Sequence, residues 1–346
     1  MRKKIIYSVS LLITLFAACK KNTSVSQQKG KIENSVPFQN AEKQKTKERK
    51  KPAISDSAGV YTQSFILEKG KTYPFTTLQK EIITLTAPTG ESQKLLSESL
   101  DEITFTVEDI VDNIYNMNIH FNRKKTSQTS EGKTVLIDTK HAAPKDENLK
   151  KKWMTDKALT GNTLKMKMEV SGKILSIEGF QLIYTKVSDA LNKIVKDHKI
   201  KEQLLEETKQ RFNEPSLIDQ FSKNILILPT KGAKIGEEWK RTEDLTPDGK
   251  VKLHTTYILK KVENGMVEIS VKGGIPRQSQ KQKQNGITYT VSSEMSQSGT
   301  LRFLQTSGWI DSQNILIKTV QKESMTDGKK TQSMISNTQT RLIINP

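Results

Sequence analysis

From about residue 60 onward, the chain alternates apolar and polar residues in short segments. The clearest segment is residues 164–170, Leu-Lys-Met-Lys-Met-Glu-Val, which places apolar side chains on one face and charged side chains on the other. Period-two alternation bounded by Gly, Asn, Asp and Pro is typical of antiparallel strands that bury one face. Similar alternation occurs in residues 103–107, 117–121, 253–259, 267–271 and 315–317. The pattern therefore predicts a mainly β protein of the α+β class.

A helical period replaces this alternation near the middle of the chain. In residues 188–212, apolar residues recur every three or four positions, and charged residues fill most of the others. This spacing predicts one amphipathic helix of about six turns. Pro215 fits the first turn of a second, shorter helix that ends at Pro229. We therefore expect a helical insert between two β-rich halves.

The two halves share three landmarks in the same order along the chain. Each landmark is a turn of small or polar residues next to an alternating segment, and together they indicate an internal repeat. The matched pairs are residues 70–73 with 236–239, residues 111–113 with 262–264, and residues 171–174 with 307–310. We expect two similar antiparallel β-sheet halves. Alternation alone leaves open whether they form two sheets or one continuous curved sheet.

The N-terminus has the pattern of a secretory signal. Residues 1–4 are basic, and residues 5–18 form an apolar run that is too short to span a bilayer as a helix. Ala17 and Ala18 precede Cys19, the only cysteine of the chain, and this arrangement resembles a bacterial lipobox, whose thiol is acylated. We expect lipidation at Cys19, with palmitate among the acyl groups. An ordinary signal peptide with an incidental cysteine is the alternative.

A basic segment of low hydrophobicity and no periodicity follows Cys19. Such a composition favours a disordered tether. The chain is accordingly divided into a lipoprotein signal peptide (1–18), a lipidated Cys with a disordered basic tether (19–57), a first β half (58–187), a helical insert (188–228) and a second β half (229–346).

The net charge of +18 invites a nucleic-acid interpretation that its distribution weakens. Residues 1–18 account for three of these charges and residues 20–53 for seven, which leaves +8 on residues 54–346. A secreted, lipid-anchored protein does not meet the genome, so we expect a membrane as partner and no nucleic acid. The residues after Cys19 lack an early Asp, which favours the outer membrane within the cell envelope and periplasm.

Several of these features occur together in one known group of proteins. The lipobox, the basic tether and the motifs at residues 69–73, 171–174 and 236–239 together resemble a family of uncharacterised envelope lipoproteins common in Bacteroidota. The resemblance covers most of residues 60–346. It implies an anchored, duplicated β body. It implies no activity, because the family is a domain of unknown function.

Motifs for catalysis are missing from the sequence. The four histidines are far apart, without the HxH or HExxH spacing of a zinc site, and there is no Gly-x-Ser-x-Gly elbow or phosphate-binding glycine loop. We expect a protein that is not an enzyme and that has no metal and no cofactor. Adjacent carboxylates such as Glu206-Glu207 keep open a hydrolase of an envelope polymer.

Three aromatic residues occupy the landmarks: Tyr73, Trp239 and Trp309. They either pack in the core at strand starts or line a cleft between the halves, which is the usual place for a ligand. The first hypothesis is a non-catalytic binding or carrier protein for an apolar or amphipathic ligand. The alternative is a protein–protein or cell-wall docking module, which would have a filled core and an exposed apolar patch.

Overall fold

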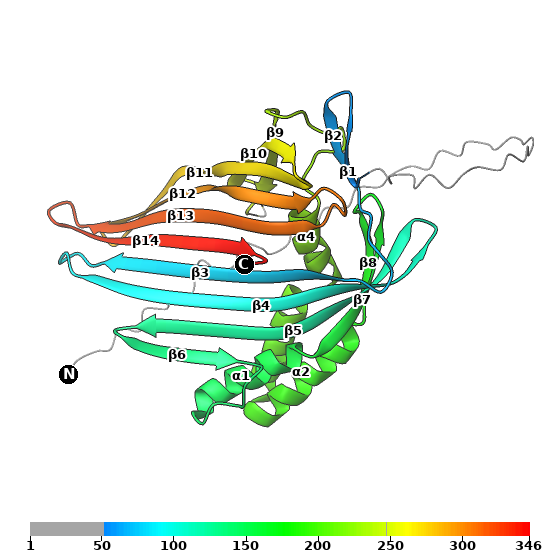
Figure 1. The fold of residues 1–346 in the computed structure, drawn as a ribbon. Coiled ribbons are helices and arrows are strands. Elements are labelled where there is room, and N and C mark those ends of the chain that lie inside the picture. Colours follow the sequence, from blue (N-terminus) through cyan, green and yellow to red (C-terminus); the bar gives the residue numbers. More distant parts are fainter. Residues whose placement is uncertain (1–51, 247) are drawn as a thin grey trace, which may run out of the picture.

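The computed structural model describes residues 52–246 and 248–346. These residues form one large antiparallel sheet of 12 strands, a two-stranded sheet and the helices α1–α4 (Figure 1). The predicted mainly β fold of the α+β class is confirmed. Among the described residues, none of the helices combines the length and the apolar composition needed to span a bilayer.

The two β-rich halves join in one continuous sheet. The first half contributes β3 (Thr72–Thr86), β4 (Ser92–Val111), β5 (Ile114–Ser130), β6 (Lys133–Asp138), β7 (Asn162–Glu169) and β8 (Ile174–Glu178). The second contributes β9 (Glu238–Asp244), β10 (Lys252–Glu263), β11 (Met266–Gln284), β12 (Ile287–Leu304), β13 (Ile310–Thr326) and β14 (Thr331–Ile344). The spatial order is β8-β7-β5-β4-β3-β14-β13-β12-β11-β10-β9, with β6 beside β5. Because β14 pairs with β3, the alternative of two separate sheets is wrong.

The first landmark has the same backbone geometry in both halves. The amide of Gly70 donates to the carbonyl of Val107 at 2.7 Å, and the amide of Gly236 donates to the carbonyl of Leu259 at 2.7 Å. Both glycines have positive φ, +77° and +85°, which L-residues rarely adopt. Each turn therefore starts its half by fastening to the neighbouring strand.

The other two landmarks also correspond, one of them with a shifted alignment. Gly172 donates to the carbonyl of Glu169 and Gly308 to that of Leu304, both at 2.8 Å. In the hairpin turns, however, the left-handed pair in the first half is residues 112–113 and that in the second half is residues 264–265. The match of residues 111–113 with 262–264 is therefore one position out of register.

The helical layer differs from the prediction. The expected single helix over residues 188–212 is two helices, α2 (Phe180–Ile194) and α3 (His198–Arg211). The break has a local cause: the Asp197 side chain accepts from the amides of Lys199 and Ile200 and so starts α3 as its N-cap.

Two further helices complete this layer. Helix α4 (Glu214–Ile225) carries the expected proline in its first turn. Helix α1 (Glu147–Leu159) has no apolar stripe, so the hydrophobic pattern of the sequence does not predict it.

The end of the proposed tether is folded. Ile54–Ser57 form β1, which pairs with β2 (Val60–Gln63), and the amide of Ile54 donates to the carbonyl of Gln305 at 3.0 Å. Assigning residues 54–57 to a disordered tether is therefore wrong, because the apolar side chain of Ile54 is buried in the core. The signal peptide, Cys19 and the tether up to residue 51 lie outside the described residues.

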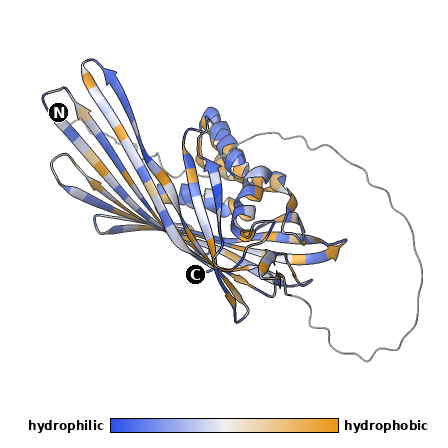
Figure 2. Ribbon diagram, turned by 90° about the horizontal axis from the view of Figure 1, so that it is seen from above, coloured by the Kyte–Doolittle hydropathy of each residue, from blue (hydrophilic) through white to orange (hydrophobic). Residues whose placement is uncertain are grey.

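Helix α4 requires the sheet to curve. Ten strand spacings separate the edge strands β8 and β9, about 48 Å in a flat sheet, whereas a helix of α4's length spans about 18 Å. Both edges nevertheless contact α4: Glu214 accepts from the amide of Ile177 in β8 at 3.1 Å, and Lys223 pairs with Glu243 of β9 at 2.7 Å. The face toward the helices is therefore concave. Figure 2 shows the helices on that side only, with the long strand ends extending past them.

Aromatic side chains fill the centre of this concavity. The ring of Phe221 on α4 lies 5.5 Å from Phe75 and 5.0 Å from Phe105, both in edge-to-face geometry. Trp309 lies 5.3 Å from Phe105 on the other side. Edge-to-face rings at these separations add to the burial of apolar area. The core therefore joins residues of both halves through the helical insert.

Candidate functional site

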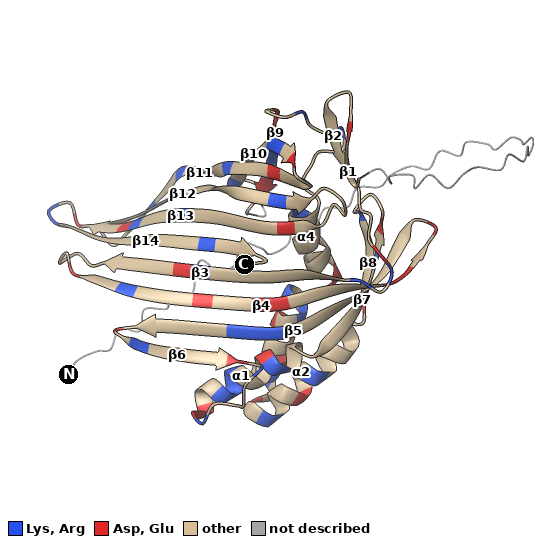
Figure 3. Ribbon diagram, in the orientation of Figure 1, with Lys and Arg blue, Asp and Glu red and all other residues tan. Residues whose placement is uncertain are grey.

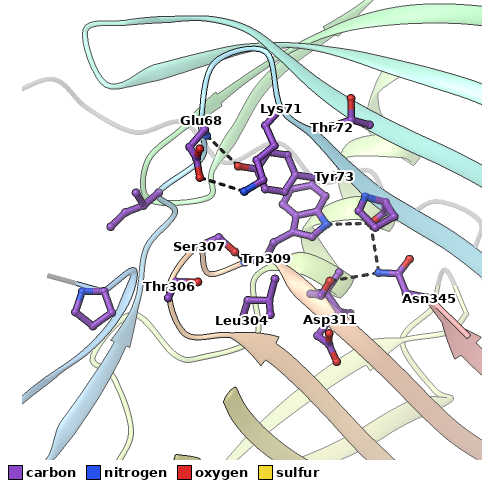
Figure 4. A pocket seen from close by; sticks show the side chains of 14 residues that line it. Glu68, Lys71, Thr72, Tyr73, Leu304, Thr306, Ser307, Trp309, Asp311 and Asn345 are labelled. Atoms are coloured by element: carbon purple, nitrogen blue, oxygen red, sulfur yellow. Dashed lines mark hydrogen bonds and ion pairs between the residues drawn. The ribbon is translucent and has the colours of Figure 1, made fainter. Parts of the chain in front are cut away.

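A surface cavity of about 480 Å³ lies between the two halves (Figure 4). It forms where β14 ends at Ile344, so that the start of β3 and the start of β13 continue without a strand between them. Asn345 partly fills this gap: its amide nitrogen lies 3.3 Å from the carbonyl oxygens of both Pro74 and Ile310. The cavity is therefore a consequence of how the halves meet.

Two of the three landmark aromatics line this cavity. Tyr73 and Trp309 are both buried, and their ring centroids are 5.3 Å apart. The hydroxyl of Tyr73 accepts from the amide of Glu68 at 2.9 Å, and the indole nitrogen of Trp309 donates to the carbonyl of Pro74 at 2.9 Å. Their polar atoms are thus occupied by backbone groups, and the rings offer apolar surface only.

Trp239 does not join them. It is not among the residues that line the cavity and instead stacks on Tyr257 across β9 and β10, with centroids 5.7 Å apart. Arg241 lies over the other ring of this pair, 5.4 Å from the centroid of Tyr257. The indole nitrogen of Trp239 is buried without a hydrogen-bond partner. The repeat places Trp239 at a strand start, as it does Tyr73, but at the far edge of the sheet.

Charged groups lie at the rim of the cavity. The ammonium of Lys71 pairs with Glu68 at 3.1 Å, and the hydrogen bond to Glu68 raises the pKa of Lys71. Burial raises the pKa of the Tyr73 hydroxyl, which stays protonated. Among the described residues there is no group of three or more His, Cys, Asp or Glu side chains that would hold a metal ion. The cavity offers shape and apolar walls, with a charged rim.

A second surface was not predicted from the sequence. The five central strands β4, β3, β14, β13 and β12 extend past the helices (Figure 1). We call their concave side beyond the helices the inner face; it continues the side on which Phe75 is buried. Strand pairing places these aliphatic residues there: Ile83, Leu85, Leu95, Ile315, Ile317 and Leu342. All six are half-buried.

Charge separates the two faces of these five strands. The inner face carries Glu81 and Glu323 and, in these strands beyond the helices, no Lys or Arg. The outer face of the same segments carries Lys80, Lys94, Glu98, Glu294, Lys318, Lys322 and Arg341. Figure 3 shows how charged residues are distributed along the strands. Charged side chains normally occupy the solvated face of a sheet. The inner face therefore has the composition of a face that packs against another molecule or element.

The polar groups of the inner face are mostly hydroxyls and amides. Glu81 lies at its centre, where Thr340 donates to one carboxylate oxygen at 3.2 Å and Ser97 approaches the other at 3.5 Å. Ile83 and Leu95 pair directly across β3 and β4, one step further from the helices. Aliphatic side chains are interspersed with hydroxyl and amide side chains, so this surface is amphipathic. The signal in the sequence is a set of adjacent aliphatic residues, such as Ile82-Ile83 and Leu95-Leu96, which place apolar groups on both faces.

Comparison with known proteins places the chain in a family. The model of DUF6263, a family of unknown function, matches residues 112–310, more than half of the chain. The chain belongs to this family. The match runs from the turn between β4 and β5 to the start of β13, so the family region includes the helical insert and Trp239 and Trp309. No curated protein matches this DUF6263 chain.

Solved structures align with this chain only at low similarity. A structure described by its lipid–protein interactions, lipovitellin, aligns at 11% identity with a TM-score of 0.39, over 81% of this chain and 26% of lipovitellin. The COG4313 outer membrane channel of Pseudomonas putida aligns at 9% identity and a TM-score of 0.17, over 81% and 97% of the two chains. OpdQ of Pseudomonas aeruginosa aligns at 6% identity and 0.14, over 75% and 68%. The chain thus spans about a quarter of the length of lipovitellin.

Proposed function

We propose that this protein is an envelope lipoprotein that binds or carries an amphipathic ligand on its inner face, without catalysing a reaction. In this proposal, Cys19 follows the signal peptide and carries the lipid anchor. The lipid holds the protein at a membrane, for which we propose the outer membrane. The observation that carries the proposal is the charge difference between the faces of the five central strands.

The composition of the inner face suits an acyl chain with uncharged polar groups. Burying one methylene group is favourable by about 0.8 kcal/mol, and the half-buried Ile and Leu side chains offer the contacts. From Gln79 to Leu85, β3 spans about 20 Å, and Ile83 and Leu85 form the aliphatic part of its inner face. Hydroxyls such as Thr340 and Ser97 can bond to glycerol or amide groups.

The curvature of the sheet supports the same function. A concave surface covers more of a ligand than a flat one, and ligand sites are usually concave. Helix α4 keeps the sheet curved by contacting both β8 and β9, so the inner face is formed before any ligand arrives. A preformed site avoids the entropic cost of ordering on binding.

The test uses two adjacent isoleucines that point to opposite faces. Ile83 lies on the inner face and Ile82 on the outer face, and each is half-buried. The full chain is purified gently from its native host, and bound small molecules are identified by native mass spectrometry and lipid extraction. We expect a stoichiometric amphiphile in the wild type, its loss in Ile83→Lys, and its retention in Ile82→Lys. A ligand retained equally by both variants would place the site elsewhere and refute the proposal.

A second function, docking on an envelope partner, is favoured by one observation. Tyr289, Val291 and Met325 are 40%, 43% and 38% exposed on the strand ends furthest from the helices. Exposed apolar groups in one region commonly mark protein contacts. If the wild type is purified without any ligand, this function replaces the first, and crosslinking in intact cells identifies the partner.

A further inference from the structure

A second cavity lies within the helical layer, away from both surfaces described above. It has a volume of about 600 Å³ and is formed by α1, the end of α2 and the start of α3. Five lysines line it: Lys150, Lys151, Lys193, Lys196 and Lys201. Glu147 is the one acidic residue of the described chain that lines it.

Few of these lysines are neutralised by the protein. Lys150 lies 3.4 Å from Glu147, and Lys201 donates to the side-chain oxygen of Asn192 at 3.2 Å. Lys151, Lys193 and Lys196 are exposed and make no ion pair within the described residues. Like charges that converge on one cavity repel each other, so an anion bound there is stabilised by all of them at once.

Interactions within the protein account for only some of the lysines at this cavity. Lys193 lies in the last turn of α2, where the helix dipole favours a cation. Asp146 and Asp197 lie near the cavity in the chain, but their carboxylates accept backbone amides as the N-caps of α1 and α3. Each of these carboxylates thus satisfies two amides in the first turn of its helix. The cavity therefore keeps an excess of positive charge that is available to bind an anion.

Apolar side chains adjoin the lysines. Met154, Ile194 and Val195 line the same cavity. On α3, Ile200 and Leu204 are 50% and 36% exposed and lie one turn apart, so they share a face of the helix. Basic residues beside exposed aliphatic residues are typical of surfaces that meet phosphate groups of amphiphiles.

We propose that the cavity between α1, α2 and α3 binds a phosphate group of a multiply charged anion. The source of the phosphate is either a lipid headgroup, with Ile200 and Leu204 in contact with its acyl region, or a soluble phosphate compound. This site is independent of the proposed function on the inner face. It lies on helices and is lined by lysines, whereas the inner face lies on strands and carries no Lys or Arg beyond the helices.

The experiment compares two triple variants with the same change in charge. Lys151→Gln, Lys193→Gln and Lys196→Gln remove the unpaired lysines of the cavity. Lys165→Gln, Lys167→Gln and Lys173→Gln remove three exposed lysines of β7 and the turn after it. All proteins are full chains with Cys19→Ala, so that they lack the thiol needed for acylation and share the basic residues 20–53 as background. The first probe is inorganic pyrophosphate in low-salt buffer, followed by calorimetry and by hydrogen exchange of residues 147–201.

We expect the cavity variant to bind pyrophosphate at least about tenfold more weakly, and the control variant to stay within about twofold of the parent chain. The parent chain should also show slower exchange in residues 147–201 when pyrophosphate is added. Equal weakening in both variants, or no binding by the parent chain, would overturn the proposal.

Vesicles of phosphatidylcholine, with and without phosphatidylglycerol, identify the source of the phosphate. A lipid headgroup predicts sedimentation with the anionic vesicles that depends on the cavity lysines and that falls in Ile200→Ser with Leu204→Ser. That aliphatic double variant should leave pyrophosphate binding unchanged. If the vesicles do not bind through these lysines while pyrophosphate does, the ligand is a soluble phosphate compound.

Discussion

Tyr73 of the first half and Trp309 of the second half are in ring contact, with centroids 5.3 Å apart. Both rings also hydrogen-bond to backbone groups of the first half. The hydroxyl of Tyr73 accepts from the amide of Glu68, and the indole nitrogen of Trp309 donates to the carbonyl of Pro74 in β3. This contact fastens the two halves at the point where β14 ends. The pair is therefore a structural joint as well as the wall of the cavity beside it.

Trp309→Ala should be strongly destabilising. The side chain is fully buried among aromatic residues, so its removal leaves a large cavity. It also removes one of two side-chain donors to the carbonyl of Pro74 and leaves the longer bond from Asn345. Truncation of a buried aromatic residue typically costs about 3–5 kcal/mol of the free energy of unfolding. Urea unfolding followed by circular dichroism measures this. Trp309→Phe keeps a ring and should lose clearly less. If the alanine variant lost less than about 1 kcal/mol of unfolding free energy, Trp309 would not hold the two halves together.

Alanine at Gly308 should cost more than alanine at Gly70. Both glycines have similar positive φ, +74° and +77°, so backbone strain of about 1–2 kcal/mol applies to both. A methyl group at Gly308 would also lie 2.1 Å from the carbonyl oxygen of Ser64, whereas at Gly70 it would meet nothing within 4 Å. Comparing the thermal unfolding of the two variants separates the effect of backbone strain, which both share, from that of the steric clash with Ser64, which only the Gly308 variant has. Equal melting temperatures would show that the segment at Ser64 moves aside freely.

The ion pair between Arg123 and Asp138 should make stability depend on acid pH. The hydrogen bond from Arg123 lowers the pKa of the buried Asp138 carboxyl to about 2 from its usual 3.8. Because the folded state favours the ionised form, the contribution is complete above about pH 5 and is lost as the pH falls toward 2. The expected loss is about 2 kcal/mol.

Asp138→Asn provides the comparison for this pH dependence. The variant lacks the titrating group, so the difference in unfolding free energy between wild type and variant should shrink between pH 4 and pH 2. Urea titrations at pH 7, 4 and 2.5 measure it. A difference that stays constant over this range would show that Arg123 does not stabilise the ionised carboxylate. The nearby salt bridge of Arg123 with Glu102 remains in both proteins at neutral pH.

Cys19→Ala should release the protein from the membrane fraction. The acyl chains on this thiol would supply the attachment, and without them the basic residues 20–53 give only salt-sensitive binding. Cell fractionation followed by a high-salt wash and immunoblotting measures the distribution. Lys20→Ala, which leaves the thiol in place, should stay membrane-bound. Membrane retention of the cysteine variant after the wash would rule out the lipid anchor.

Much of the local structure follows from the sequence. Residues 103–107, 117–121 and 164–170 alternate in polarity, and each lies in or overlaps a strand with one buried face. Glycines at the landmarks place the turns, because residues with positive φ favour Gly and Asn. Helix α1 was not predicted because polar residues lie on all of its faces. The break before α3 was not predicted because it depends on the Asp197 side chain accepting backbone amides as an N-cap, which leaves the hydrophobic period unchanged.

The sequence by itself determined the strands, the turns and the correspondence of the two halves, since these depend on side-chain period and backbone sterics within a few residues. Tertiary structure alone decided which strands are neighbours, because backbone hydrogen bonds carry no sequence information and β14 pairs with β3 through them. That pairing brings Trp309 to Tyr73 and leaves Trp239 at the sheet edge beside Tyr257. Curvature around α4 then makes one face concave, and this long-range packing separates the inner face from the charged outer face.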